Sequence, residues 1–164
     1  PWQIAEACAA TANGATRHSA ALLKSVRSYD YSRQLYQNKT EVLSIVDSAD
    51  YNWAAVQRGM YLMANDITSS SNTVYYTLGN YSYNGVSLPV AAKTGTSQLG
   101  EGKTNNAIFM CYAPFDDPEI AVAIVVARGL SGANLSRMAR NVLDAYFSLG
   151  SISNTAEREN SLLK

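Results

Sequence analysis

Residues 106–127, NAIFMCYAPFDDPEIAVAIVVA, decide how this chain folds. They contain two apolar runs, 106–113 and 119–127, that are typical of strands, with the turn-forming segment Pro-Phe-Asp-Asp-Pro between them. A link this short joins antiparallel strands, because a parallel pair needs a crossover of a dozen or more residues. The second run is apolar at successive positions, so we expect that strand to be covered on both faces.

The residues around this pair predict further elements. Residues 86–94 alternate with a period of two and predict a third strand. Residues 1–12, 51–65 and 135–149 instead repeat apolar side chains every three or four positions, which predicts helices. Residues 20–50 show no clear period, and we expect loops with short elements there.

The ends of two predicted helices carry signals of their own. Asp50 or Asn52 is expected to cap the second helix, because a short polar side chain accepts hydrogen bonds from first-turn N–H groups. Gly150 is expected to end the third helix, since glycine readily takes the left-handed conformation that closes helices. Residues 150–164 are polar and aperiodic, and we predict a disordered tail.

The order of the elements predicts the fold class. Two helices, three antiparallel strands and a final helix favour an α+β fold, in which an antiparallel sheet is flanked by helices on both faces. The length of 164 residues fits one domain, which we assign to residues 1–149.

The composition excludes several classes of function. Thirteen Lys and Arg residues balance thirteen Asp and Glu residues, so the basic excess of a protein that binds nucleic acid is absent. One His and two Cys, without the spacing of metal ligands, predict no metal site, and we expect no cofactor. Cys8 and Cys111 are expected to be small buried hydrophobes, and the sequence leaves open whether they are bridged.

The most concentrated chemistry lies in Lys93-Thr94-Gly95-Thr96-Ser97, at the end of the first predicted strand. Strand alternation places Thr94 and Thr96 on one face, and Lys93, Gly95 and Ser97 on the other. The two threonine hydroxyls together suit a carboxylate, and Gly95 lets another backbone approach closely. A backbone N–H of such a strand also suits an oxyanion of the kind that forms in acyl transfer.

Three segments resemble the transpeptidase domain of penicillin-binding proteins. Lys93-Thr94-Gly95-Thr96-Ser97 resembles the third motif of that family, whose set is Ser-x-x-Lys, Ser-Asp-Asn and Lys-Thr-Gly. Pro1-Trp2-Gln3-Ile4-Ala5 with Ala12-Asn13-Gly14 resembles the family's helix T-P-x-Q-x-A … A-N-G-G. Phe109-Met110-Cys111-Tyr112-Ala113-Pro114 resembles its strand W-F-x-G-Y-A-P. The resemblance covers about residues 1–149 and is strongest to the monofunctional, class B branch.

The resemblance implies roles for the strand residues. In the intact enzyme a serine activated by a lysine attacks the D-Ala-D-Ala end of a peptidoglycan stem peptide, and an amine of a neighbouring strand then takes the acyl group. Lys93 would supply positive charge near the substrate carboxylate, Thr94 and Thr96 would bind that carboxylate, and the Thr96 N–H would form half of the oxyanion hole. Gly95 and Ser97 would complete the substrate-binding strand, and β-lactams would acylate the same serine.

The resemblance also implies that the nucleophile lies upstream of this chain. Ser161-Leu162-Leu163-Lys164 matches Ser-x-x-Lys but stands in the wrong order, and Ser70-Ser71-Asn72 and Ser82-Tyr83-Asn84 lie too close to Lys93 to be the second motif. We therefore expect the C-terminal portion of a transpeptidase domain, incomplete without the rest of the domain and inactive alone. Its parent is expected at the extracytoplasmic face of the bacterial cytoplasmic membrane.

Other functions stay open. A serine β-lactamase or a β-lactam sensor domain of the same fold also carries a Lys-Thr-Gly strand. Gly102-Lys103-Thr104 resembles the end of a phosphate-binding loop, although its first glycine is replaced by Ser97 and no helix is expected to follow. A non-catalytic interaction module is the third possibility.

Overall fold

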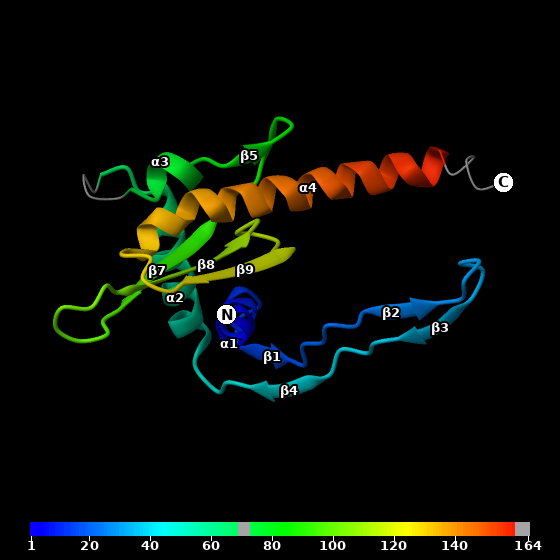
Figure 1. Ribbon diagram of the computed structural model, residues 1–164, viewed down its shortest axis with the longest axis horizontal. Helices are drawn as coiled ribbons and strands as arrows, with labels where there is room; N and C mark the ends of the chain where they lie inside the picture. The colour runs from blue at the N-terminus through cyan, green and yellow to red at the C-terminus, as the bar shows by residue number, and fades with distance from the viewer. Residues whose placement is uncertain (69–72, 160–164) are drawn as a thin grey trace.

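The computed structural model describes residues 1–68 and 73–159, with side chains described through residue 149. Figure 1 shows a small three-stranded sheet with helix α4 across one face and helix α1 on the other. The elements, in chain order, are α1 (Trp2–Ala12), β1 (Thr16–His18), β2 (Ser25–Arg27), β3 (Gln34–Gln37), β4 (Val42–Ile45), α2 (Asp50–Asn65), α3 (Tyr75–Leu78), β5 (Ser82–Tyr83), β6 (Val86–Ser87), β7 (Ala91–Ser97), β8 (Asn106–Ala113), β9 (Ile120–Val126), a 3₁₀ turn η1 (Gly132–Leu135) and α4 (Ser136–Glu159). The predicted α+β class is confirmed.

The central sheet has the strand order β7-β8-β9, and both pairs are antiparallel. The predicted hairpin at residues 106–127 is therefore confirmed. The strand expected at residues 86–94 is divided into β6 and β7. Pro89 lies between the two and has no N–H to donate to a ladder, which accounts for the break.

Both faces of the sheet are covered, as the apolar pattern of β9 predicts. On one face, Phe109 and Val122 pack with Leu135, Ala139 and Leu143 of η1 and α4. On the other face, the buried side chains of α1, α2, β7 and β8 form a second cluster, which consists of Cys8, Met60, Ala91 and Tyr112. The sheet thus separates two apolar cores.

The ends of two helices differ from the predictions. The N-cap position of α2 is Ala49, without a side-chain cap, so neither Asp50 nor Asn52 has the predicted role. Asn52 instead donates from Nδ2 to the Ser48 Oγ, 2.9 Å away. Helix α4 continues through Gly150 to Glu159, because a glycine inside a helix costs only about 1 kcal/mol and does not remove a backbone hydrogen bond. Residues 160–164 of the predicted tail lie outside the described residues.

Residues 16–45 form one long antiparallel hairpin, which extends away from the sheet in Figure 1. Strand β1 pairs with β4 near its base, and β2 pairs with β3 near its tip. The short elements expected in this segment are present, but their pairing was not predicted. The side chains of β3 and β4 are all exposed, so the hairpin contributes little to either core.

Residues 73–90 pack on α4 through Tyr81. Its ring is 1% exposed, and its hydroxyl donates to Asp144 Oδ1 at 2.8 Å. Burial and the neighbouring Asp144 both raise the pKa of the Tyr81 hydroxyl, so it stays protonated at neutral pH and can donate.

Replacing Tyr81 with phenylalanine should lower the free energy of unfolding by about 1 kcal/mol, because a hydrogen bond to a charged but partly solvated group is lost. Chemical denaturation of the protein measures this change. Tyr76→Phe is the matched control, since Tyr76 is 75% exposed and its replacement should change stability by less than about 0.5 kcal/mol. Equal effects of the two replacements would contradict the role given to Tyr81.

The two cysteines are free thiols and are both fully buried. Cys8 Sγ lies 3.3 Å from the Cys111 carbonyl oxygen and donates to it, which joins α1 to β8. Burial raises the pKa of the Cys8 thiol to about 12, and burial together with Cys8 raises that of Cys111. The expectation that Cys8 and Cys111 are small buried hydrophobes is confirmed, and the two cysteines do not form a disulfide.

Neither thiol should react with iodoacetamide at pH 8.5 in the folded protein, whereas both should react after unfolding, because only the thiolate is nucleophilic. Intact mass spectrometry counts the adducts. The raised pKa values also predict that stability falls as the pH rises above about 9, since unfolded thiols then lose protons that the folded state retains. Rapid modification of the native protein would contradict this assignment.

Candidate functional site

Strand β7 brings all five predicted site residues onto one edge of the central sheet. Lys93 pairs with Met110 of β8, and Thr96 pairs with Ala107. Lys93, Thr96 and Ser97 are exposed, whereas Thr94 and Gly95 are half-buried. Strand alternation directs Thr94 and Thr96 to the face that carries α4, and Lys93, Gly95 and Ser97 to the face that carries α1. Among the described residues, no strand pairs with the other edge of β7.

Lys93 presents a positive charge at this edge. Its Nζ donates to the Thr94 carbonyl oxygen at 2.6 Å, and it forms no ion pair within the part of the chain that the structure describes. The edge of β7 therefore presents an ammonium on one face of the strand and two threonine hydroxyls on the other, and both kinds of group can bind an anion such as a carboxylate.

The amino-terminal end of β7 is closed by α2. Ala91 and Ala92 are fully buried, and Asn65 Nδ2 donates to the Val90 carbonyl oxygen at 2.9 Å. The same amide group donates to the Tyr61 carbonyl oxygen within α2, so a single side chain fixes the helix against the start of the strand. The accessible part of the edge therefore begins at Lys93.

Gly132 supports the strand from the side of α4, and the sequence did not predict it. A Cβ at Gly132 would lie 2.5 Å from the Gly95 carbonyl oxygen and 2.8 Å from its nitrogen, and would also collide with the Ile108 carbonyl oxygen. Glycine is therefore needed where η1 crosses β7 and β8. A Cβ at Gly95 itself would point to the other face of the sheet, where it would lie 3.3 Å from the Ile108 Cβ, so the close approach of Gly132 depends on the glycine at 132 and not on the one at 95.

The weaker motifs do not join this cluster. Ser82, Tyr83 and Asn84 lie in the β5–β6 hairpin, where Asn84 and Gly85 have positive φ values of 49° and 79° that form its turn. Ser70-Ser71-Asn72 and Ser161-Leu162-Leu163-Lys164 lie outside the described residues.

The proposed phosphate-binding loop has the wrong structural context. Gly102-Lys103-Thr104 lies in the link between β7 and β8, so a strand and not a helix follows it. Without the N-terminus of a helix, the loop lacks the dipole and the N–H groups that hold phosphate in such sites. The prediction of a nucleotide-binding protein is therefore not supported by the fold.

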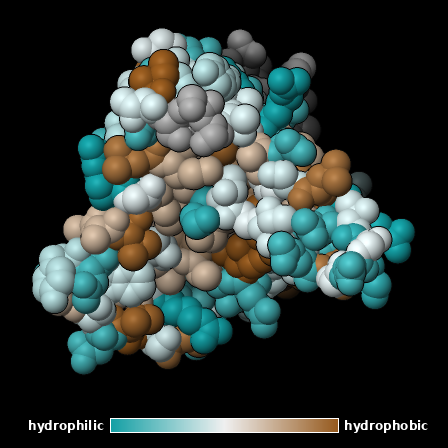
Figure 2. All heavy atoms as spheres, turned by 90° about the vertical axis from the view of Figure 1, so that its left-hand side faces the viewer, coloured by the Kyte–Doolittle hydropathy of each residue, from teal (hydrophilic) through white to brown (hydrophobic). Residues whose placement is uncertain are grey.

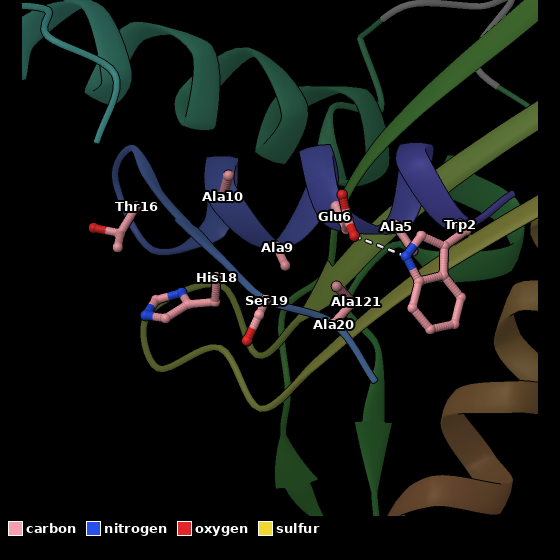
Figure 3. A pocket seen from close by; sticks show the side chains of 10 residues that line it. All are labelled: Trp2, Ala5, Glu6, Ala9, Ala10, Thr16, His18, Ser19, Ala20 and Ala121. Atoms are coloured by element: carbon pink, nitrogen blue, oxygen red, sulfur yellow. Dashed lines mark hydrogen bonds between the residues drawn. The ribbon is translucent and has the colours of Figure 1, made fainter. Parts of the chain in front are cut away.

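One pocket lies far from β7. Figure 3 shows it between α1, the start of the long hairpin and Ala121 of β9, the strand at the opposite edge of the sheet. Its volume is about 310 Å³. Its one carboxylate is already engaged, because Glu6 accepts a hydrogen bond from Trp2 Nε1 at 2.7 Å and pairs with Arg17 at 3.4 Å. This pocket is not part of the Lys93 edge.

Two classes of feature are absent from the described part of the chain. It contains no group of three or more His, Cys, Asp or Glu side chains placed to hold a metal ion. It also contains no helix that combines the length and the apolar character required to cross a bilayer.

Comparisons with known proteins agree on one family. The profile of the penicillin binding protein transpeptidase domain matches residues 1–144. Penicillin-binding protein 2A of Bacillus subtilis is 31% identical over 169 residues, a match that covers 92% of this chain and 22% of that protein. Peptidoglycan D,D-transpeptidase MrdA of Haemophilus influenzae is 29% identical over 109 residues, which cover 57% of this chain and 16% of that protein.

A solved structure shows the same fold. The imipenem acyl-enzyme complex of penicillin-binding protein A from M. tuberculosis superposes with a TM-score of 0.68 at 23% identity, over 90% of this chain and 30% of that one. The chain thus spans about a fifth of the length of the curated relatives that it matches. Taken together with the profile match over most of its length, these similarities show that the chain belongs to the penicillin binding protein transpeptidase domain family.

Proposed function

We propose that this chain is the C-terminal portion of the transpeptidase domain of a longer protein, a peptidoglycan D,D-transpeptidase that cross-links stem peptides. The observation that carries this proposal is the open edge of β7, where Lys93, Thr94 and Thr96 offer an ammonium and two hydroxyls. An extended peptide binds such an edge by adding a strand to the sheet, and the cationic end of the edge suits its terminal carboxylate.

Each residue of the edge has a role in this proposal. Lys93 and Thr96 are the catalytic residues, of which Lys93 supplies positive charge and Thr96 supplies a backbone N–H to the oxyanion hole. Thr94 and Thr96 bind the carboxylate of a stem peptide that ends in D-Ala-D-Ala. Gly95 and Ser97 complete the strand along which the peptide lies.

The reaction is acyl transfer through a serine that this chain does not supply. The serine oxygen attacks the carbonyl carbon of the penultimate D-Ala, an ester forms, and the peptide bond to the terminal D-Ala breaks as its nitrogen takes a proton. The amine of a second stem peptide then attacks the ester, a new peptide bond forms, and the serine regains its proton. A β-lactam acylates the same serine, so the longer protein binds β-lactams covalently and this chain alone does not.

Exposed apolar side chains on α4 support the proposal that the rest of the domain packs against this chain. Figure 2 views the molecule from the left-hand side of Figure 1 and shows hydrophobic side chains at the surface among hydrophilic ones. On α4, the apolar side chains of Met138, Val142 and Leu149 are 50%, 42% and 61% exposed. Apolar side chains in such a row are typical of a helix face that is covered by another element.

The location follows from the substrate. Because peptidoglycan lies outside the cytoplasm, we place the longer protein at the extracytoplasmic face of the bacterial cytoplasmic membrane, with its membrane anchor outside this chain. No role for nucleic acid, metal or cofactor is included in the proposal.

Labelling with a fluorescent penicillin tests this function. The longer protein should form a stable adduct of one label per molecule on an upstream serine, whereas this chain alone should stay unlabelled. Hydrolysis of a chromogenic cephalosporin separates the alternatives, because a β-lactamase of the same fold turns over many molecules and a transpeptidase stays acylated. Failure of the longer protein to form an adduct would overturn the proposal.

A further inference from the structure

A basic pocket lies directly beyond the end of strand β7. It has a volume of about 550 Å³ and is lined by Leu99, Gly102, Lys103, Thr104 and Arg128. Four of these residues come from the link between β7 and β8, and Arg128 comes from the turn after β9. Two cationic side chains therefore approach one polar cavity from segments that are far apart in the sequence.

The position of Arg128 is fixed by its backbone. Its N–H donates to Asn106 Oδ1 at 3.0 Å, and its φ is 56°, so the turn after β9 is held against the first residue of β8. The N–H of Leu130 donates to the Asn105 carbonyl oxygen at 3.1 Å and ties the same turn to the loop. The only carboxylate of the loop, Glu101, does not line the pocket. Within the described residues, neither Lys103 nor Arg128 forms an ion pair.

The open part of β7 determines which way a bound peptide runs. With its terminal carboxylate at Thr94 and Thr96, a peptide that ran parallel to β7 would place its preceding residues against Ala91 and Ala92. These residues are fully buried under α2, so that direction is closed. An antiparallel peptide instead runs past Thr96 and Ser97, which are exposed, toward the basic pocket.

The spacing indicates which residue of the peptide reaches the pocket. Each residue of an extended strand advances about 3.3 Å, so two steps from the terminal residue span roughly 7 Å, close to the distance along β7 from Thr94 to Thr96. A side chain of several atoms on the third residue from the C-terminus can then extend beyond Ser97. A carboxylate at its end would meet the Lys103 ammonium and the Arg128 guanidinium.

We infer that Lys103 and Arg128 form a specificity pocket for a free carboxylate on the side chain of the third residue from the C-terminus of the donor stem peptide. This inference rests on the proposed function, because it takes the terminal carboxylate to lie at Thr94 and Thr96. The pocket selects between donor peptides and takes no part in the acyl transfer itself.

Two synthetic donor peptides that end in D-Ala-D-Ala test the inference in the longer protein. They differ only in the third residue from the C-terminus, which is glutamate in one and glutamine in the other. The release of D-Ala gives kcat/KM for each peptide. At low ionic strength the glutamate peptide should be preferred about 3- to 10-fold, the range expected for two exposed ion pairs. The preference should fall in 0.5 M NaCl, since salt screens exposed charges.

A double variant and a matched control test whether the preference for the glutamate peptide arises at the basic pocket. Lys103→Gln with Arg128→Gln should reduce the preference to about one, while kcat/KM for the glutamine peptide stays within about twofold of the unaltered protein. Lys24→Gln with Arg27→Gln removes the same two charge types from the exposed long hairpin and should keep the preference. Equal use of the two peptides by the unaltered protein, or a preference that survives in the double variant, would overturn the inference. If no fluorescent penicillin adduct forms either, the proposed function itself fails, and the pocket assignment fails with it.

Discussion

Replacing Lys93 with glutamine in the longer protein should lower the rate of acylation by penicillin about 100- to 1000-fold, the range for loss of a preorganised charged group that stabilises developing charge. Lys93 is exposed, and its ammonium contacts the Thr94 carbonyl oxygen of its own strand. Its removal therefore takes positive charge from the open edge of β7 without leaving a cavity. A time course of fluorescent penicillin labelling gives the rate constant.

The control for this variant is Lys39→Gln, which removes an exposed lysine from the long hairpin. It should acylate at the unaltered rate. Thermal unfolding of both variants should match the unaltered protein within about 2 °C, because surface substitutions change stability by no more than about 0.5 kcal/mol. A Lys93→Gln protein that acylates within threefold of the unaltered rate would contradict the catalytic role of Lys93.

The parts of the fold that the sequence predicted are those determined by neighbouring residues. The β8–β9 hairpin follows from its short, turn-forming link, and α1 and α2 follow from apolar repeats within a few turns. The approach of α4 to the sheet also follows, because β9 is apolar on both faces and requires two covering layers.

The features that the sequence did not predict depend on contacts between distant segments. Gly132 is required only because η1 crosses the backbones of Gly95 and Ile108, which lie more than 20 residues away in the chain. The contact of Tyr81 with Asp144 likewise joins residues 63 positions apart. No local pattern of apolar or turn-forming residues encodes such pairs.

The candidate site likewise has one part that the sequence predicted and another that depends on contacts between distant segments. Its five strand residues are consecutive, so one short motif identified them and strand alternation assigned their faces. The closure of one end of β7 by Asn65, and the pocket formed with Arg128 at the other end, arise only when α2 and the turn after β9 come together with the strand. The sequence therefore identified the candidate strand but did not show which of its ends is closed, and so did not show in which direction a bound peptide would run.

Replacing Gly132 with alanine should lower the free energy of unfolding by about 2–3 kcal/mol, since overpacking against atoms that cannot move carries a cost of this size. The added Cβ would meet the Gly95 carbonyl oxygen, the Gly95 nitrogen and the Ile108 carbonyl oxygen, which are all backbone atoms of the central sheet. Relief of this collision requires η1 to move away from β7, so the same substitution in the longer protein should also lower the rate of acylation by penicillin. Urea denaturation and the labelling time course measure the two effects.

Gly59→Ala is the matched control for this prediction. Gly59 lies within α2, and a Cβ there would have no heavy atom within 4 Å. The same chemical change should therefore raise the free energy of unfolding by about 0.5–1 kcal/mol, because alanine favours a helix more than glycine does. The two variants add one methyl group each and are expected to shift stability in opposite directions. If Gly132→Ala is as stable as the unaltered protein, η1 does not lie against Gly95, and Gly132 does not support strand β7.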